Sequence, residues 1–581
     1  MGRILLVIGG CAVLGAVFGV SVAVGNDPLA GATLLSFPLA QLALRSRLGP
    51  YVERHVGLAA TAHLLIALFA MAAAIALVTL GDANGPVIIS VGLGAIAAIT
   101  SAVERVIWAR HPTRLAAAGL PKAELFLGRF SWFDRTSHPY RRLEEGLATT
   151  VILAETAVSM TLIFDATGGT PMAALVGLAI VYGVWSVSSW IVCFRRAARG
   201  EASLRPILAS DIVELSPRIL IHFSGSIRAL YQLDQWLPLV AGSGIPFLLI
   251  ARELPSFHAM KEKYRVPTVL IGDFPDLDLV VPPSARLALY VNTGTANNHL
   301  IRFDQLIHAQ IHHGDSDKPP SSGKTMRLYD LHLVAGPAAV DRLERAGIVT
   351  DRRDAVVVGR PMTDDLALSS PRGPRPVVLY APTWEGFHLD SALSSVGALA
   401  ETITAAMPSD ALFVVRPHPL TGTVDRDLKP SLANLRRLVE ARGDYGRYVE
   451  PSQGPSVIEL MEECHVLICD VSSVLVDFLA ADRPAIVSDI GGLGDDLVAA
   501  YPSTAWAHRL ESDGANLAEV LADALGADRH RELRREMRHR MLGYLGHAED
   551  RFHEVLATLL RGGDVNDVET APSRTGDQRL D

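Results

Sequence analysis

The apolar residues of this chain are distributed in two different ways. Through the first 195 residues they form long runs, and from about residue 216 onward they form short runs separated by polar, glycine-containing or proline-containing segments. Runs of about 17–25 apolar residues are typical of membrane-spanning helices, whereas short runs that alternate with amphipathic stretches are typical of a helix-covered parallel sheet. The pattern therefore predicts an N-terminal α-helical membrane domain of about six spans, followed by α/β domains.

Six apolar stretches in the first part are long enough to cross a bilayer. They are Ile4–Val24, Pro28–Leu44, Val56–Leu80, Val87–Val103, Leu147–Phe164 and Pro171–Cys193. Every second linker lacks Lys and Arg, whereas the linkers between those are rich in arginine. By the positive-inside rule, the N-terminus and everything after Arg195 are then cytoplasmic. We expect a multi-pass protein of the cell membrane with a cytoplasmic C-terminal half, and cleavage of the first stretch as a signal peptide would leave this orientation unchanged.

Two features of this part of the chain invite a functional interpretation. Glu155 lies near the middle of the fifth stretch, where an ionisable group is costly. Because no second charge accompanies it, a protonated or hydrogen-bonded glutamate between helices is favoured over ion transport. The linker Arg105–Gly146 is basic and contains the aromatic segment Phe126–Asp134, which predicts either an interfacial segment near anionic lipid or a plain cytoplasmic loop.

The second part of the chain predicts two α/β domains in series. The first set of expected strands is Arg218–Phe223, Pro246–Glu253, Pro267–Gly272, Arg286–Val291, Leu306–Gly314, Leu331–Gly336 and Ala355–Pro361. The second set is Val377–Trp384, Leu412–Leu420, Tyr448–Pro451, His465–Asp470 and Pro484–Asp489. Helices are expected between strands, at Ser391–Met407 and over much of Gly514–Arg561. The predicted domains are 1–199, 200–373 and 374–561, with a disordered polar tail over 562–581.

Composition and short motifs exclude several classes of function. The net charge of −9 gives no basic footprint for nucleic acid. The four cysteines have neither zinc-site nor disulfide-framework spacing, so buried free thiols are expected. The segment 321–325 (SSGKT) resembles the end of a phosphate-binding loop, but Lys318 stands where that loop needs its first glycine. His308 and His312 are four residues apart without a third ligand, so we expect no metal site.

Four of the expected strands end in polar residues that suit phosphate chemistry. These residues are His313 and Gly314, Thr383 and Glu385, Arg416 and His418, and Asp470, Ser472 and Ser473. An arginine offers a planar fork to phosphate oxygens, and a neutral histidine can accept a hydroxyl proton. A glycine permits close approach of a ligand, and a helix that begins at Ser472 or Ser473 supplies free N–H groups. Each residue alone has a commoner structural explanation, but carboxyl ends of parallel strands meet at one edge, so together they predict an anion site between two facing domains.

The same segments resemble a known family. The motifs VVLYAPTWEG, RPHP and CDVSSVLVDFLAADRPAIV, preceded by HG and VVVGRPMTDDL, resemble the CDP-glycerol glycerophosphotransferases, which are teichoic acid primases and polymerases. The resemblance covers about Arg218–Asp489 and is most specific in the second domain. It implies a GT-B fold of two Rossmann-like domains, and transfer of glycerol phosphate from CDP-glycerol to a hydroxyl of a polyprenyl-linked or glycolipid acceptor, with release of CMP and no cofactor. One departure is the acidic loop 314–318 (GDSDK), where the family has Thr-Pro and lysines, and this loop bears on the identity of acceptor and donor.

The resemblance also implies roles for the strand-end residues. His313 falls on the catalytic histidine and is expected to be the base, with His418 as a second catalytic group. Arg416, Thr383, Asp470, Ser472 and Ser473 are expected to bind the donor, with Asp470 facing a ribose hydroxyl or an amino group; Gly314 and Glu385 are expected to support them. Two alternatives remain: a GT-B nucleotide-sugar glycosyltransferase that acts on a lipid-linked acceptor, and a transporter or flippase with a regulatory cytoplasmic half.

Overall fold

The computed structural model describes residues 114–129, 200, 202–368, 370–371, 375–386, 392–451 and 454–563. Leu115–Glu124 and the chain from Ile207 onward form one compact unit. This unit contains two separate sheets.

The first sheet has eight strands in the order β1-β4-β3-β2-β5-β6-β7-β8. Their bounds are β1 Leu115–Ala118, β2 Ile219–Phe223, β3 Phe247–Ala251, β4 Thr268–Ile271, β5 Leu287–Tyr290, β6 Ile307–Gln310, β7 Leu331–Val334 and β8 Ala355–Val357. All neighbouring pairs are parallel except β1 with β4, which is antiparallel. From β2 the sheet is built outward through β3 and β4 on one side, and then through β5 to β8 on the other side of β2. The switch point at which such sheets bind ligands therefore lies between β2 and β5.

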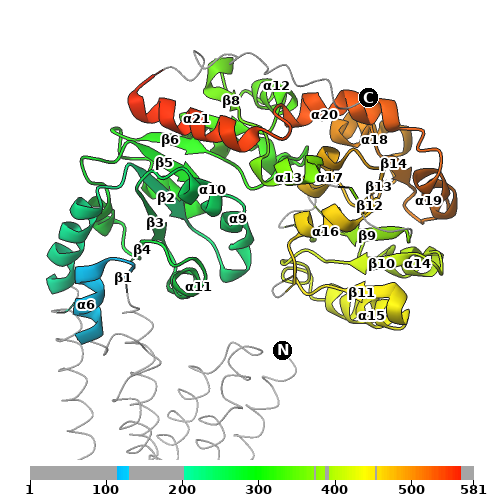
Figure 1. The fold of residues 1–581 in the computed structure, drawn as a ribbon, viewed down its shortest axis with the longest axis horizontal. Coiled ribbons are helices and arrows are strands. Elements are labelled where there is room, and N and C mark those ends of the chain that lie inside the picture. Colours follow the sequence, from blue (N-terminus) through cyan, green and yellow to red (C-terminus); the bar gives the residue numbers. More distant parts are fainter. Residues whose placement is uncertain are drawn as a thin grey trace, which may run out of the picture. The chain divides into compact units, whose positions relative to one another are not determined.

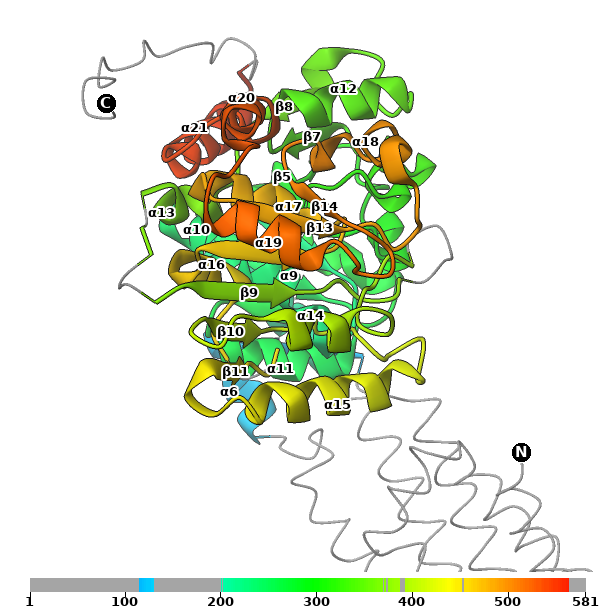
Figure 2. The same ribbon diagram turned by 90° about the vertical axis from the view of Figure 1, so that its right-hand side faces the viewer.

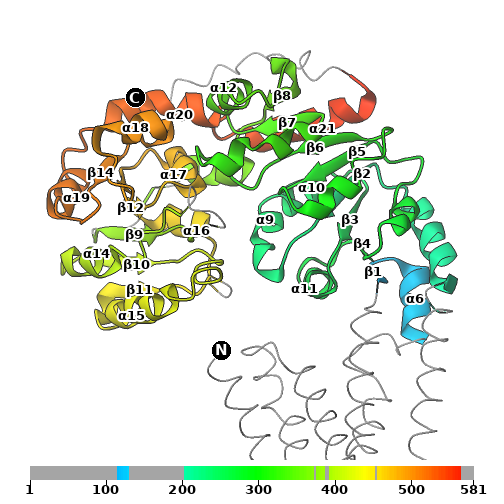
Figure 3. The same ribbon diagram turned by 180° about the vertical axis from the view of Figure 1, so that it is seen from behind.

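One face of the first sheet is covered by helices that follow its strands and by the last helix of the described residues. The helices are α9 Tyr231–Asp234, α10 Leu237–Gly242, α11 Leu254–Tyr264 and α21 Ala548–Arg561. Apolar side chains of all four pack in one core with β2, β3 and β5. Figure 3 shows α9, α10 and α11 beside β2, β3 and β4, and Figure 1 shows α21 alongside β6 and β8. A helix that is last in the sequence thus completes the first domain.

The second sheet has six strands, all parallel, in the order β11-β10-β9-β12-β13-β14. Their bounds are β9 Val377–Ala381, β10 Leu412–Val415, β11 Gly446–Tyr448, β12 Val466–Cys469, β13 Ala485–Ser488 and β14 His508–Leu510. Because both faces are covered, the central strands are fully apolar, as in VLIC of β12.

Different helices cover the two faces of the second sheet. On one face lie α14 Ala400–Ala406, α15 Leu428–Glu440 and α19 Leu517–Leu525, which stand in front of the strands in Figure 2. On the other face lie α13 Asp364–Leu368, α16 Val457–Glu463, α17 Ser473–Phe478 and the end of α20 Arg531–Leu542. Other helices of the described residues are α6 Pro121–Arg129, α12 Pro337–Arg345 and α18 Leu497–Ala500, and residues 202–215 are helical as well.

The prediction of an N-terminal membrane domain has to be corrected. Within the described part of the chain, no helix is both long enough and apolar enough to cross a membrane. The six candidate stretches, Glu155 and the first expected domain as a whole lie outside the described residues, apart from the segment 114–129. That segment is not a loop, because Leu115–Ala118 is buried as the edge strand β1 and is followed by α6. Its apolar residues are therefore explained by a sheet, and the fold that the structure supports is the pair of α/β domains.

The expected strands from residue 218 onward are present, although most are shorter than the apolar runs that predicted them. The exception is Tyr448–Pro451, because β11 spans Gly446–Tyr448 and shares only Tyr448 with it. The edge strands β1 and β14 were missed, because each has only three or four residues and little alternation. The helix expected from Ser391 begins only at Ala400. The domain boundaries stay predictions, and the tail beyond residue 563 lies outside the described residues.

Candidate functional site

His313 lies in the turn that follows β6, at the carboxyl edge of the first sheet. Its Nδ1 is 2.9 Å from the carbonyl oxygen of Val291, which follows β5. A carbonyl oxygen can only accept, so Nδ1 carries the proton and Nε2 is left as an acceptor. Burial lowers the pKa of His313 by more than its hydrogen bond to Val291 raises it, so the ring is neutral at about pH 7. These are the properties of a base that takes up a proton through Nε2.

The turn before His313 is held from both sides. His312 adopts a left-handed backbone conformation with φ of 55°, which is unusual for a residue other than glycine. Its N–H donates to Oε1 of Gln310, and its carbonyl accepts from Nε1 of Trp236. A strained conformation fixed in this way keeps the orientation of the next residue constant.

His418 lies at the carboxyl edge of the second sheet, after β10, and has the opposite tautomer. The backbone N–H of Leu420 donates to its Nδ1 at 3.1 Å, so the ring proton is on Nε2. Burial, followed by the charge of Lys318, lowers the pKa of His418 to about 3. The ring is therefore neutral and presents an N–H donor, and it is stacked on Trp384 with centroids 6.0 Å apart.

Tyr231 of α9 brings the two histidines into one site. Its ring makes edge contacts with both, with centroids 6.1 Å from His313 and 5.3 Å from His418. One residue of the first domain thus contacts a predicted catalytic group from each sheet. The sequence did not indicate Tyr231, since nothing in α9 distinguishes it from an ordinary partly buried aromatic.

The predicted HG and D-x-S-S motifs meet directly. A Cβ added to Gly314 would lie 2.5 Å from both Cβ and Oγ of Ser473. Such a distance is too short for any side chain, so glycine is required for this approach of the two domains. Ser472 is the N-cap residue of α17, as expected, but its hydroxyl donates to the carbonyl of Asp470 instead of accepting from the helix.

Asp470 is placed differently from the ligand-facing group that was expected. Its side chain is buried and accepts from the backbone N–H of Thr383 at 2.7 Å, from that of Ser395 at 3.2 Å, and from the hydroxyl of Ser488. Burial raises its pKa, against the lowering effect of these hydrogen bonds. Both carboxylate oxygens are occupied, so in this structure Asp470 orders the loop after β9.

Arg416 and Glu385 also hold loops. Arg416 donates through Nε to the carbonyl of Pro455 at 2.9 Å and through Nη2 to that of Pro451 at 3.2 Å. Glu385 accepts from the backbone N–H groups of residues 422, 424 and 425. Burial opposes ionisation of Glu385, but these hydrogen bonds outweigh it and lower its pKa. Glu385 thus orders the loop 422–425 and Arg416 the backbone at Pro451 and Pro455, and their expected roles towards the donor stay predictions.

Lys318 joins the site without having been predicted as part of it. Its Nζ donates to Oγ1 of Thr383 at 3.0 Å, which links the loop after β6 to the loop after β9. Burial lowers the pKa of Lys318 to about 8, with the Asp470 charge acting in the opposite direction. In the sequence Lys318 lies five residues after His313, at the end of the acidic loop 314–318, and no local pattern there indicates its contact with Thr383.

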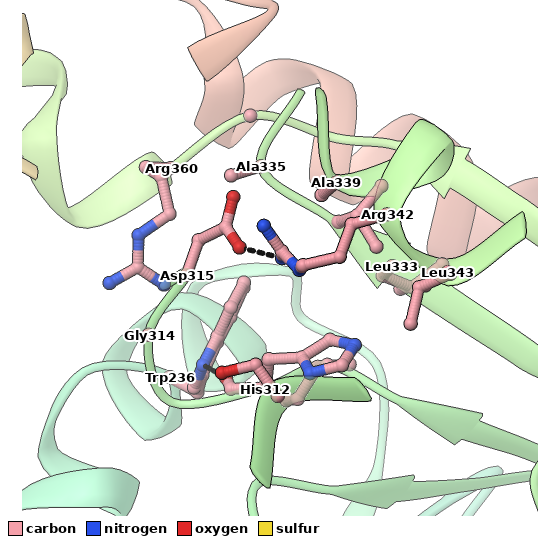
Figure 4. A pocket seen from close by; sticks show the side chains of 14 residues that line it. Trp236, His312, Gly314, Asp315, Leu333, Ala335, Ala339, Arg342, Leu343 and Arg360 are labelled. Carbon is pink, nitrogen blue, oxygen red and sulfur yellow. Dashed lines mark hydrogen bonds and ion pairs between the residues drawn. The ribbon is translucent and has the colours of Figure 1, made fainter. Parts of the chain in front are cut away.

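The acidic residues of the loop after His313 face away from His418. Asp315 and Asp317 both pair with Arg342 of α12, and Asp317 also accepts from the backbone N–H of Ser503 at 2.6 Å. Figure 4 shows Asp315 and Arg342 on one wall of a small cavity behind the loop, opposite His312 and Trp236. The cavity has room for about one water molecule. Both acidic side chains are therefore engaged within the fold, where one guanidinium is shared by two carboxylates.

A buried ion pair fixes the first domain to α17 of the second. Arg360, which follows β8, donates to Asp477 through Nε at 2.7 Å and through Nη2 at 3.1 Å, and both side chains are less than 5% exposed. Both residues stand in the motifs that carried the family resemblance, but their pairing across 117 positions could not be predicted from either motif. Among the described residues, no group of three or more His, Cys, Asp or Glu side chains could hold a metal ion.

The fold and the two histidines indicate a class of enzyme. Two parallel α/β domains, with a neutral base from one opposite a neutral N–H donor from the other, form a group-transfer site at facing strand ends. The family comparison then identifies the segment: residues 303–545 match the family CDP-Glycerol:Poly(glycerophosphate) glycerophosphotransferase. The match includes every predicted site residue and somewhat less than half of the 581 residues. It confirms the resemblance for this segment and the expected enzyme class, a CDP-glycerol glycerophosphotransferase-type transferase.

The chain was also compared with curated proteins and with solved structures. No curated protein matches the chain. Among solved structures, the chain is similar to the wall teichoic acid polymerase TagF, with 13% identity over 65% of this chain and 98% of that one and a TM-score of 0.43. It is also similar to UDP-GlcNAc 2-epimerase from Neisseria meningitidis, with 14% identity over 58% of this chain and 99% of that one and a TM-score of 0.39.

Proposed function

We propose that this protein transfers glycerol phosphate from CDP-glycerol to a hydroxyl group of a lipid-linked cell-envelope acceptor and releases CMP. The family match supports the reaction type and the donor. The acceptor is proposed to be polyprenyl-linked or a glycolipid, with the α/β domains at the cytoplasmic face of the cell membrane. A reaction of this kind builds a polymer of the teichoic acid type.

The observation that carries the proposal is the pair of opposite tautomers on Tyr231. His313 offers an acceptor nitrogen and His418 offers a donor N–H, and both rings contact one tyrosine at the junction of the domains. Transfer of a phosphoryl group to a hydroxyl needs both, because one proton must leave the nucleophile while negative charge grows on the phosphate oxygens.

In the proposed reaction, the acceptor hydroxyl displaces CMP from the β-phosphorus of CDP-glycerol. The acceptor oxygen attacks the β-phosphorus of CDP-glycerol and forms a new P–O bond, while its proton moves to Nε2 of His313. The bond from the β-phosphorus to the bridging oxygen breaks, and CMP leaves with the electron pair. The Nε2–H of His418 donates to a phosphate oxygen on which charge develops. Positioning and electrostatic stabilisation supply most of the catalysis in such reactions.

The proposed function is tested with full-length protein, labelled CDP-glycerol and polyprenyl-linked or glycolipid acceptors. We expect CMP release and acceptor-bound label from the wild type. His313→Ala should lower kcat by about 10²–10⁴-fold, the usual contribution of a general base, and it should leave CDP-glycerol binding within a fewfold. His258→Ala is a matched control, because this histidine is exposed and lies on α11 outside the site.

Two results would contradict the proposal. The first is absence of CMP release together with binding of a UDP- or GDP-sugar, which would favour the glycosyltransferase alternative. The second is a His313→Ala variant with wild-type turnover, which would remove the histidine site from the reaction.

A further inference from the structure

Lys318 is a cation of the first domain that reaches into the second without an acidic partner. Its Nζ donates to Oγ1 of Thr383 at 3.0 Å, and within the described ranges it forms no ion pair with a carboxylate. The nearby carboxylate, Asp470, has both oxygens engaged by Thr383, Ser395 and Ser488. A partly buried ammonium group without a counter-ion is costly, so its environment favours an anion that is supplied from outside the chain.

The surroundings of Lys318 indicate where such an anion would lie. Lys318 acts electrostatically on His418, since its charge is the second largest cause of the lowered pKa of that ring. Asp315 and Asp317 of the same loop are paired with Arg342 and so do not neutralise it. An anion bound to Nζ of Lys318 would therefore lie near Thr383 and His418.

We infer that Lys318 binds the diphosphate of the nucleotide donor, and that this contact holds the His313 loop against donor that is bound to the second domain. The inference deepens the proposed function and rests on it, because it places a diphosphate in the same site. Nζ of Lys318 would donate hydrogen bonds to the bound diphosphate, either in addition to its hydrogen bond with Oγ1 of Thr383 or in place of it. Lys318 and His313 are five residues apart on one loop, so any anion that holds Lys318 also fixes the position of the base.

The inference has a pH signature. Lys318 has a pKa of about 8 in the free protein, so its charge is present below about pH 8 and is lost as the pH rises through that value. The other groups that act on it are Asp470, which favours its charged form, and His418, which is neutral throughout this range. Binding of a diphosphate should therefore weaken above about pH 8 and should be accompanied by proton uptake.

The test is binding of CDP-glycerol and of inorganic pyrophosphate to full-length protein by calorimetry, at about pH 7 and about pH 9.5. Lys318→Met should weaken both ligands about ten- to hundredfold at the lower pH, the usual range for a lost charge-assisted hydrogen bond. Lys318→Arg should stay within about threefold of the wild type at the lower pH and, unlike the wild type, should keep its affinity at the higher pH, because a guanidinium does not titrate there. Lys324→Met is the matched control, since Lys324 is exposed on the same segment. Thermal unfolding of each variant checks that it folds.

The outcomes separate this inference from the proposed function. Wild-type affinity in Lys318→Met, or an equal loss in Lys324→Met, overturns the inference and leaves the proposed reaction intact. Binding of pyrophosphate without CDP-glycerol overturns the proposed donor, and the lysine variants then decide the inference on pyrophosphate alone. Binding of neither ligand by the wild type overturns both.

Discussion

His313 and His418 show how backbone contacts assign different chemistry to two identical side chains. The carbonyl of Val291 accepts a hydrogen bond from Nδ1–H of His313, whereas the N–H of Leu420 donates to Nδ1 of His418. Burial is the largest cause of the lowered pKa of both rings. The sequence motifs HG and RPHP named both residues, but only their backbone partners distinguish an acceptor nitrogen from a donor nitrogen.

Asp470 provides a prediction at the level of one residue. Asp470→Ala should lower the free energy of unfolding by roughly 3 kcal/mol, because each buried N–H that loses its partner costs about 1–3 kcal/mol. Thr383 and Ser395 would lose such a partner. Denaturant unfolding measures the change, and Asp495→Ala, at an exposed position, should change the stability by less than about 0.5 kcal/mol.

The expected ligand contact of Asp470 makes a different prediction for the same variant. Unchanged stability, combined with a raised KM for the donor, would show that Asp470 contacts the nucleotide, as the sequence suggested. It would also show that the hydrogen bonds to the loop after β9 contribute little.

At the scale of elements, the site depends on loops that follow β6, β9, β10 and β12. Parallel strands bring all four loops to the carboxyl edges of the two sheets, which is why residues spread over 313–473 come together. The elements themselves were predictable from short apolar runs bounded by Gly, Pro and Asp. Their ends were less predictable, because the last residues of an apolar run, such as Ile311, are buried in the loop instead of continuing the strand.

Gly314 provides a prediction at this scale. Gly314→Ala should lower kcat/KM about tenfold or more, because its Cβ would lie 2.5 Å from Ser473 and would push the His313 loop away from α17. The double variant Gly314→Ala with Ser473→Gly should recover part of the loss, since it removes the atoms that clash. Gly491→Ala is the control, because its Cβ would meet nothing closer than 3.6 Å. A double variant as impaired as Gly314→Ala would show that the contact with Ser473 is not the cause.

At the scale of the whole described unit, residues far apart in sequence close the two domains on each other. Helix α21 packs into the core of the first sheet although α20, just before it, packs with the second. The Arg360–Asp477 pair joins the end of β8 to α17, and Lys318 joins the His313 loop to Thr383. These links decide how the base and the predicted donor site face each other.

Breaking the buried Arg360–Asp477 pair should be costly. Asp477→Ala leaves the Arg360 guanidinium buried without its counter-ion, and we expect a loss of about 3–5 kcal/mol in denaturant unfolding. Replacing both residues by leucine should cost much less, because no unpaired charge remains. If the double replacement were as destabilising as Asp477→Ala, desolvation of an unpaired charge would not be the reason.

The buried histidines predict acid-sensitive stability. Burial lowers the pKa to about 3 for His222 and His418 and to about 4 for His332 and His508. In the unfolded chain these groups take up protons below about pH 6.5, whereas in the folded chain they do so only near pH 3–4. Stability should therefore be unaffected above about pH 6.5 and should fall as the pH drops from there, by up to about 1 kcal/mol per pH unit for each group.

His332→Phe gives the sharpest version of this test, because His332 is buried and burial is the largest cause of its lowered pKa. This variant should unfold with a weaker acid dependence than the wild type. His258→Gln, at an exposed position, should leave the dependence unchanged. An identical pH profile for His332→Phe and the wild type would remove His332 from the explanation.

The sequence by itself determined the two α/β domains and most of the residues at their facing edges. It could do so because strand-forming runs and the residues that end them are local patterns, and parallel pairing places those ends together. The tertiary structure decided which polar residues are free for chemistry. Asp470 and Glu385 accept hydrogen bonds from backbone N–H groups. Lys318, Tyr231 and Arg360 instead join the site through contacts with residues 65 to 187 positions away, which is farther than any single motif extends. Such contacts depend on how two sheets pack, and no local pattern of apolar and polar residues specifies that packing.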